Sequence, residues 1–197
     1  MHRIAEITKL HWEMIDRWHS QPLDNQCTGF LGLVCQQLMF NFQLWHEEDI
    51  ARSKNVPDAT IAQVKRAIDG FNQQRNDYIE KLDDWITEEV ERLNIQPAAN
   101  ATQNSETAGS TIDRLAIIAL RIYHLQEQAE RADATPEHRT GVARKLAIAV
   151  MQQQDLARSA QELIDDIFAG RKKHKTYRQL KMYNDPTLNP YLYRAAG

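Results

Sequence analysis

The side chains best suited to chemistry form an acidic and a basic group in the middle of the chain. The acidic group is made of carboxylates that suit a hard divalent cation: Glu48, Asp49, Glu80 and Asp83. Mg²⁺ prefers such oxygens and keeps several of its waters. The basic group could hold a phosphate through charge-assisted hydrogen bonds: Arg52, Lys65 and Arg121. Together they predict a Mg²⁺-assisted site for a phosphorylated small molecule, where His124 or Asp69 would move a proton.

Helical periodicity places most of these residues on two long helices. In the helix expected over residues 29–53, one stripe at about 100° per residue contains Asn41, Trp45, Glu48 and Arg52, with Leu44 and Asp49 on its shoulders. In the helix expected over residues 57–93, the polar stripe contains Lys65, Asp69, Asn72, Asn76 and Asp83, with Glu80 at its edge. If the two helices pack antiparallel, the stripes face each other across a polar cleft. The open alternative is that both stripes are solvated faces.

A third polar row follows from the helix expected over residues 110–132. Its members lie at spacings of eight, three and four, with Arg114 at the edge: Asp113, Arg121, His124 and Gln128. The surrounding "LAIIALRIYHL" is otherwise nearly all apolar, so an Arg and a His within it are seldom wholly solvated. Asp113 could instead serve as an N-terminal acid favoured by the helix dipole, and His124 as a hydrogen-bonded core residue. In the helix expected over residues 135–170, Gln153 is the candidate inward polar group. The predicted ligand-binding residues are therefore Asn41, Trp45, Arg52, Lys65, Asn72, Asn76, Asp113, Arg114, Arg121 and Gln153.

The positioning elements are five helices in one all-α domain over residues 1–197. The first is expected over residues 2–19, and short loops favour antiparallel neighbours. Ser110 is expected to cap the fourth helix, Thr135 with Pro136 to start the fifth, and Gly170 to end it. The polar segment 94–110 is expected to be a flexible connection. Residues 171–197 are expected to form an extended strap packed on the body.

Composition and charge limit the compartment and the partners. Apolar residues make up 42% and charged residues 26% of the 197 residues, which is typical of a globular protein. Cys27 and Cys35 are expected to be buried free thiols, and neither a secretory signal nor a membrane span is visible, so a cytoplasmic protein is expected. Residues 171–197 hold seven Lys and Arg against one acid, a net +6, so the rest of a chain of net charge −3 carries about −9. An acidic body argues against a nucleic-acid partner. Whether the chain forms a homo-oligomer stays open.

Several well-defined chemistries are excluded by spacing. "HEED" is followed by Ile50, so it is not the H-E-x-x-H of zinc proteases. No P-loop, G-x-G-x-x-G or G-x-S-x-G occurs, and the paired Glu-x-x-His of di-iron bundles is absent.

Four stretches carry a resemblance to a known family: "NFQLWHEEDIAR", "KRAIDGFNQQRNDYIEKLD", "STIDRLAIIALRIYH" and "YRQLKMYNDPTLNPYLY". They resemble a bacterial family known as a domain of unknown function, over nearly the whole chain. The family brings no established activity. Its members often lie near genes for cell-envelope polysaccharide synthesis, which implies a link to sugar-phosphate or nucleotide-sugar chemistry.

A second, weaker similarity is to the all-α nucleotide pyrophosphohydrolases, which bind Mg²⁺ with acids from two antiparallel helices. Glu47-Glu48 is similar to the first pair of their E-E-x-x-E motif, and Glu80-x-x-Asp83 to their E-x-x-D motif. At position 51 an alanine replaces the third glutamate, so this resemblance implies Mg²⁺ binding only if Asp49 substitutes for it.

Two hypotheses follow. The first is a metal-assisted enzyme acting on a nucleotide or nucleotide-sugar in the polar cleft. The alternative is a non-catalytic binding or scaffold protein of envelope-polysaccharide synthesis, whose stripes form a buried structural polar network.

Overall fold

Five long helices occupy the ranges that periodicity predicts, to within a few residues. The computed structural model describes residues 3–182 and 185–194. Its long helices are α1 (Ile4–Trp18), α2 (Gly29–Ala51), α3 (Asp58–Arg92), α4 (Ala108–Glu130) and α5 (Pro136–Phe168). A single turn, α6 (Pro190–Tyr193), follows near the C-terminus. The predicted all-α helical bundle is confirmed.

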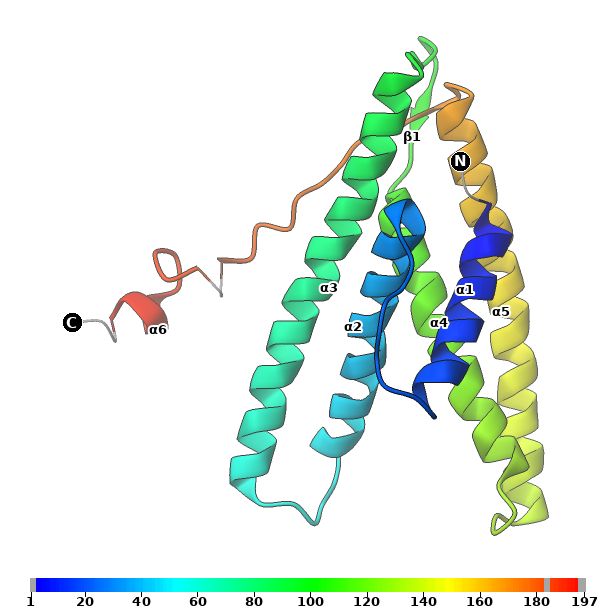
Figure 1. Cartoon of the computed structure of the whole chain (residues 1–197), viewed down its shortest axis with the longest axis vertical. Coiled ribbons are helices and arrows are strands. Elements are labelled where there is room, and N and C mark those ends of the chain that lie inside the picture. Colours follow the sequence, from blue (N-terminus) through cyan, green and yellow to red (C-terminus); the bar gives the residue numbers. More distant parts are fainter. Residues whose placement is uncertain (1–2, 183–184, 195–197) are drawn as a thin grey trace.

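The long helices form two antiparallel pairs (Figure 1). α2 packs along α3, and α4 packs along α5, while α1 contacts α2, α4 and α5. The loops at one end of the bundle are short, as antiparallel neighbours require. This arrangement brings one face of α2 against both α3 and α4, which is where the polar residues of all three helices can meet.

The main core lies where α1, α2, α3, α4 and α5 converge. Each helix contributes apolar residues at spacings of three, four and seven, so that one stripe faces inward. Fully buried members of this core include Ile7, Leu38, Leu82, Leu115 and Ala160. A smaller cluster of Leu44, Val64 and Ile68 joins the far ends of α2 and α3.

The helix ends follow local signals, with one exception. Thr135 caps α5 by accepting from the His138 N–H, Pro136 is its first residue, and Gly170 follows its end at φ +69°, all as predicted. The prediction that Ser110 caps α4 is wrong, because Thr107 is the cap and accepts from the Ser110 N–H. Asp113 is therefore the sixth residue of α4, beyond its first turn, and it is buried in the bundle.

Gly109 explains why α4 begins early. Its N–H donates to Asp83 Oδ1 of α3 at 2.7 Å. A Cβ at this position would lie 2.5 Å from the Ile79 carbonyl oxygen, so only glycine permits this approach of α4 to α3.

The connection between α3 and α4 is attached to the segment that follows α5. Strand β1 (Thr102–Gln103) pairs in parallel with β2 (Lys172–Lys173), and the Ala98 N–H donates to the Gly170 carbonyl. Segment 94–110, expected to be a flexible connection, is therefore tied by backbone hydrogen bonds.

The strap that follows β2 crosses α3 and then leaves the bundle (Figure 1). Arg178 contacts Glu80 and Asp84, and Lys181 Nζ donates to the Asn72 carbonyl at 3.4 Å. The basic strap is thus held by acids of α3. Residues 183–184 and 195–197 of the expected strap lie outside the described residues.

Two further expectations concern cysteines and membranes. Cys27 and Cys35 are free thiols, and Cys35 is buried as expected, whereas Cys27 is only half-buried. Among the described helices, none combines the length and apolar character needed to cross a bilayer.

Candidate functional site

A cleft of about 360 Å³ lies between α2, α3 and α4, within the size range of small-molecule pockets. We call it the α2–α4 cleft; its wall consists of Asn41, Leu44, Trp45, Glu48, Asp49, Arg52, Arg75, Ile117 and Leu120. Five of these residues belong to α2 and Arg52 follows its last residue; the six together are the stripe and shoulders that helical periodicity grouped. The structure therefore places this row on one wall, with apolar α4 side chains opposite.

The α2 wall changes from buried to exposed along the helix. Asn41 is buried, Trp45 and Glu48 are half-buried, and Asp49 and Arg52 are exposed. Arg52 is held by Glu48, since its guanidinium donates to the carboxylate and to the backbone carbonyl of Glu48, both at 2.6 Å. A guanidinium therefore stands at the open end of the cleft.

A buried ion pair forms the inner end. Asp113 of α4 has only 4% of its side chain exposed and accepts two hydrogen bonds from Arg75, whose side chain is 25% exposed. The Asn41 amide donates to the same carboxylate at 3.0 Å, and the Gln37 amide also donates to it. The hydrogen bonds that Arg75 donates to Asp113, reinforced by the negative charge of Asp113, raise the pKa of Arg75 above its ordinary value. Asp113 thereby fixes a guanidinium from α3 in the cleft wall.

Sequence reasoning missed Arg75. It lies seven residues after Ile68 and seven before Leu82, in the middle of the apolar stripe of α3. A charged residue in the centre of an apolar stripe needs a buried partner, so this position was the signal that could have found it.

The polar stripe predicted for α3 does not line the cleft. Lys65 and Asp69 are exposed and pair with each other on the surface, one turn apart. Asn72 and Asn76 are half-buried outside the cleft wall, and Asn72 accepts from Lys181 of the strap through its carbonyl. The face that α3 turns to the cleft carries Arg75 instead.

The four predicted metal-binding acids are not brought together. Glu48 and Asp49 line the cleft, but Glu80 accepts from Arg178 and from the Gln179 N–H. Asp83 of α3 is buried against the start of α4, and this burial raises the pKa of its carboxyl above the ordinary value. In the described part of the chain, the four do not form a group able to hold one ion. This set of acids therefore does not fit the Mg²⁺ site that the pyrophosphohydrolase resemblance implies.

Two predicted arginines of α4 lie on a different surface. Arg114 and Arg121 line a second cleft of about 680 Å³ between α4 and α5, together with Gln152, Asp155 and Ser159. Ile117 contributes to both clefts. Gln153 is half-buried on α5, outside the walls of both clefts, and within the described residues its amide nitrogen has no hydrogen-bond partner.

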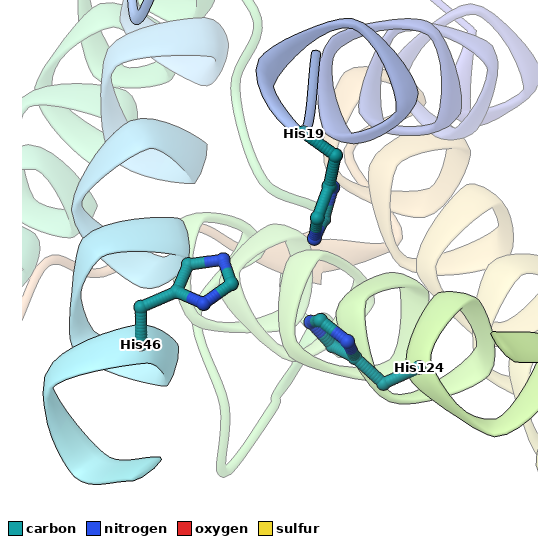
Figure 2. A group of neighbouring side chains, drawn as sticks. All are labelled: His19, His46 and His124. Carbon is teal, nitrogen blue, oxygen red and sulfur yellow. The ribbon is translucent and has the colours of Figure 1, made fainter. Parts of the chain in front are cut away.

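His124 lies behind the cleft, on the other side of Trp45. Its ring stacks on the indole with centroids 4.9 Å apart, and its Nδ1 contacts Glu127 at 2.6 Å. It also meets His19 and His46, which sequence reasoning did not single out (Figure 2). These histidines are 27 and 78 residues apart along the chain, so no local motif connects them.

Comparison with family models identifies the chain. Residues 31–176 match the model described as "Protein of unknown function (DUF4254)". The match spans most of the chain, from α2 through α5 to the strand that follows, so the chain belongs to this family. Comparisons with curated proteins and with solved structures gave no match.

Proposed function

We propose that this member of the DUF4254 family binds a phosphorylated small molecule, such as a nucleotide or nucleotide-sugar, in the α2–α4 cleft. The observation that carries the proposal is the wall itself, where two guanidinium groups share a pocket with an indole and three aliphatic side chains. Ligand pockets combine an apolar lining with a few placed polar groups in this way.

Arg75 is the cation best prepared to receive an anion. A guanidinium has five N–H donors, and Asp113 takes two of them. The remaining donors are held in a fixed orientation, which lowers the entropy lost when a phosphate binds. Arg52 supplies a second, more exposed guanidinium, and a ligand can replace its exposed pair with Glu48 at small cost.

Trp45 provides the surface for the organic part of the ligand. One face of its indole is covered by His124, which fixes the ring before any ligand arrives. Leu44, Ile117 and Leu120 complete an apolar surface suited to a base or a sugar ring.

We expect Mg²⁺ to bind only together with the phosphorylated ligand. Glu48 and Asp49 are the two acids in the cleft wall. Mg²⁺ is commonly bound through one or two carboxylates together with substrate phosphates, so these two acids suffice when the ligand carries a diphosphate. Asp69 lies outside the cleft, and His124 reaches it only through Trp45, so binding rather than a particular reaction is proposed.

Calorimetric titration tests the proposal. Inorganic phosphate, ADP, UDP and UDP-glucose are titrated into the full chain, with and without Mg²⁺. We expect saturable binding of at least one organic phosphate. Arg52→Gln should weaken it about 10- to 100-fold, because a charge-assisted hydrogen bond is lost. Arg92→Gln is the matched control, since Arg92 is also exposed and paired with a glutamate one turn away.

Three results would count against this cleft as a phosphate site. They are no binding of any of the four compounds, equal affinity in Arg52→Gln and the wild type, or an equal loss of affinity in Arg52→Gln and Arg92→Gln.

The buried network favours a second candidate function, a non-catalytic binding or scaffold protein. Asp113, Asn41 and Gln37 join α2 to α4 much as a structural polar network would. Gln37→Ala and Arg52→Gln separate the two functions. A ligand site predicts weakened binding at an unchanged melting temperature for Arg52→Gln. A purely structural network predicts that the wild type binds none of the four compounds and that Gln37→Ala, which removes a donor to the buried Asp113 carboxylate, lowers the melting temperature.

A further inference from the structure

Three histidines from three helices converge behind Trp45. His19 caps the C-terminus of α1, His46 belongs to α2, and His124 belongs to α4. One ring nitrogen from each lies within 4.8 Å of the other two. Figure 2 shows the three rings turned toward the space between these helices. In the described part of the chain, this is the one group of three or more metal-ligating side chains so close together.

In His19 and His124, Nδ1 is hydrogen-bonded on the side of the ring away from the shared space, so Nε2 faces that space. His19 Nδ1 lies 2.7 Å from the Ile15 carbonyl oxygen, which can only accept, so Nδ1 carries the proton. His124 Nδ1 lies 2.6 Å from the Glu127 carboxylate and donates to it in the same way. In the neutral rings, each Nε2 therefore has a free lone pair.

Both of these lone pairs lack a partner. His19 Nε2 and His124 Nε2 are buried and accept no hydrogen bond from any described residue. Buried polar atoms are nearly always paired, so two unpaired acceptors facing one space call for a ligand that accepts electron pairs. A metal ion is such a ligand, and a carbonyl or carboxylate behind the imidazole is the usual support of a metal-bound histidine.

An aromatic shell holds the rings in place. Tyr123 stacks on His19 with centroids 4.1 Å apart, Trp45 stacks on His124, and Phe42 contacts both His19 and His46 at their edges. These ring contacts restrict the rotation of the three imidazoles and hold one nitrogen of each toward the shared space (Figure 2).

We propose that His19, His46 and His124 form a Zn²⁺ site with three nitrogen ligands and an open fourth position. Imidazole suits Zn²⁺ and similar transition metals, whereas Mg²⁺ requires oxygen ligands. Zn–N bonds of about 2.0–2.1 Å place tetrahedral ligands roughly 3.4 Å apart, so the rings need to close by only about 1.5 Å. Three protein ligands with one exchangeable position is the arrangement of catalytic zinc, in which the ion acts as a Lewis acid. This site uses neither Arg52 nor Arg75 and does not depend on the proposed ligand cleft.

Metal titration of the chelator-treated full chain tests the proposal. We expect one Zn²⁺ per chain by calorimetry and elemental analysis, a rise in melting temperature with Zn²⁺, and no such rise with Mg²⁺. Co²⁺ should give the intense visible absorption of a four-coordinate site. It should lack the near-ultraviolet charge-transfer band of a thiolate ligand, which excludes Cys27 and Cys35 as the binding site.

Substitutions locate the ion. His46→Ala and His124→Ala should each abolish stoichiometric binding, and circular dichroism verifies that they fold. His138→Ala, an exposed histidine on α5, is the matched control and should bind as the wild type does. Glu127→Gln should weaken Zn²⁺ about 10- to 100-fold by removing the support of His124, while Glu130→Gln should not.

The Co²⁺ spectrum of the wild type tests the site even where a variant fails to fold. Substoichiometric Zn²⁺ binding, a six-coordinate Co²⁺ spectrum, a thiolate band, or full binding by folded His46→Ala would each overturn the site.

Discussion

The ion pair between Arg75 and Asp113 should stabilise the fold as well as form part of the cleft wall, and Arg75→Met tests this. The Asp113 carboxylate has 4% of its side chain exposed, against 25% for Arg75, so it depends more on its partner. After Arg75→Met, the amides of Asn41 and Gln37 are the only donors that the described residues leave to the Asp113 carboxylate. Leaving a buried charge without its partner costs about 3–5 kcal/mol, and we expect a loss of this size in the free energy of unfolding.

The double variant Arg75→Met with Asp113→Leu should be more stable than Arg75→Met alone. It removes both charges and leaves the Gln37 amide without its acceptor, at a cost of about 1–3 kcal/mol. The two substitutions should therefore be non-additive by a few kcal/mol, as expected of partners in direct contact.

Urea denaturation followed by far-ultraviolet circular dichroism measures these values, since the chain is mostly helical. Lys65→Met is the control, because Lys65 and Asp69 form an exposed pair on the same helix. It should change stability by less than about 0.5 kcal/mol. A loss below about 1 kcal/mol for Arg75→Met, or a double variant at least as unstable as the single one, would refute the reasoning.

Four further substitutions test the core, a helix cap and a contact between helices. Burial lowers the pKa of His11 to about 3 from an ordinary value near 6.5, so the unfolded chain binds more protons between these values and stability falls as pH falls through that window. The free energy of unfolding that is lost between pH 7.5 and pH 5 should therefore be about 2 kcal/mol smaller in His11→Leu than in the wild type. An equal loss in both, measured by urea titration, would contradict the lowered pKa of His11. Thr107→Ala should cost about 1 kcal/mol in the same assay and Ser110→Ala less than about 0.5 kcal/mol. A larger loss for Ser110→Ala than for Thr107→Ala would contradict Thr107 as the cap of α4. Gly109→Ala should cost about 1–3 kcal/mol or more, because its Cβ meets backbone and the Asp83 carboxylate, and wild-type stability would show that α4 does not approach α3 as described.

The helices were predictable because their signals are local. Periodicity located five helices, and Pro136 and Gly170 marked the ends of α5 correctly. The cap of α4 was not predictable in the same way. Thr107 and Ser110 are both good caps, and the choice depends on Gly109 docking against Asp83, a contact 26 residues apart.

The cleft was predictable on one wall and not on the others. The α2 row from Asn41 to Arg52 follows from a single helix wheel, and the structure places it along one cleft. The orientation of α3 depends on packing against α2 through Val64 and Ile68, which turns Lys65 and Asp69 to solvent. Periodicity shows that a helix has a polar stripe, but it does not show whether that stripe faces solvent or a neighbouring helix.

The histidine cluster was beyond sequence reasoning. His46 lay in the run "HEED", where a zinc-protease motif was excluded by spacing. Its actual neighbours, His19 and His124, come from other helices and meet it only when α1, α2 and α4 pack together. Spacing rules detect metal sites made from one segment, and this group has one ligand per helix.

The most direct test of the proposed function is the indole N–H spectrum of ¹⁵N-labelled protein during titration with UDP and UDP-glucose. The chain has four tryptophans, and Trp45→Phe assigns the signal of the one in the cleft wall. Trp18 is the internal control, since its buried indole donates to the Asp24 carbonyl. We predict a saturable shift of the Trp45 signal with the Trp18 signal unmoved. A Trp45 signal that stays in place at saturating ligand would contradict binding in the α2–α4 cleft.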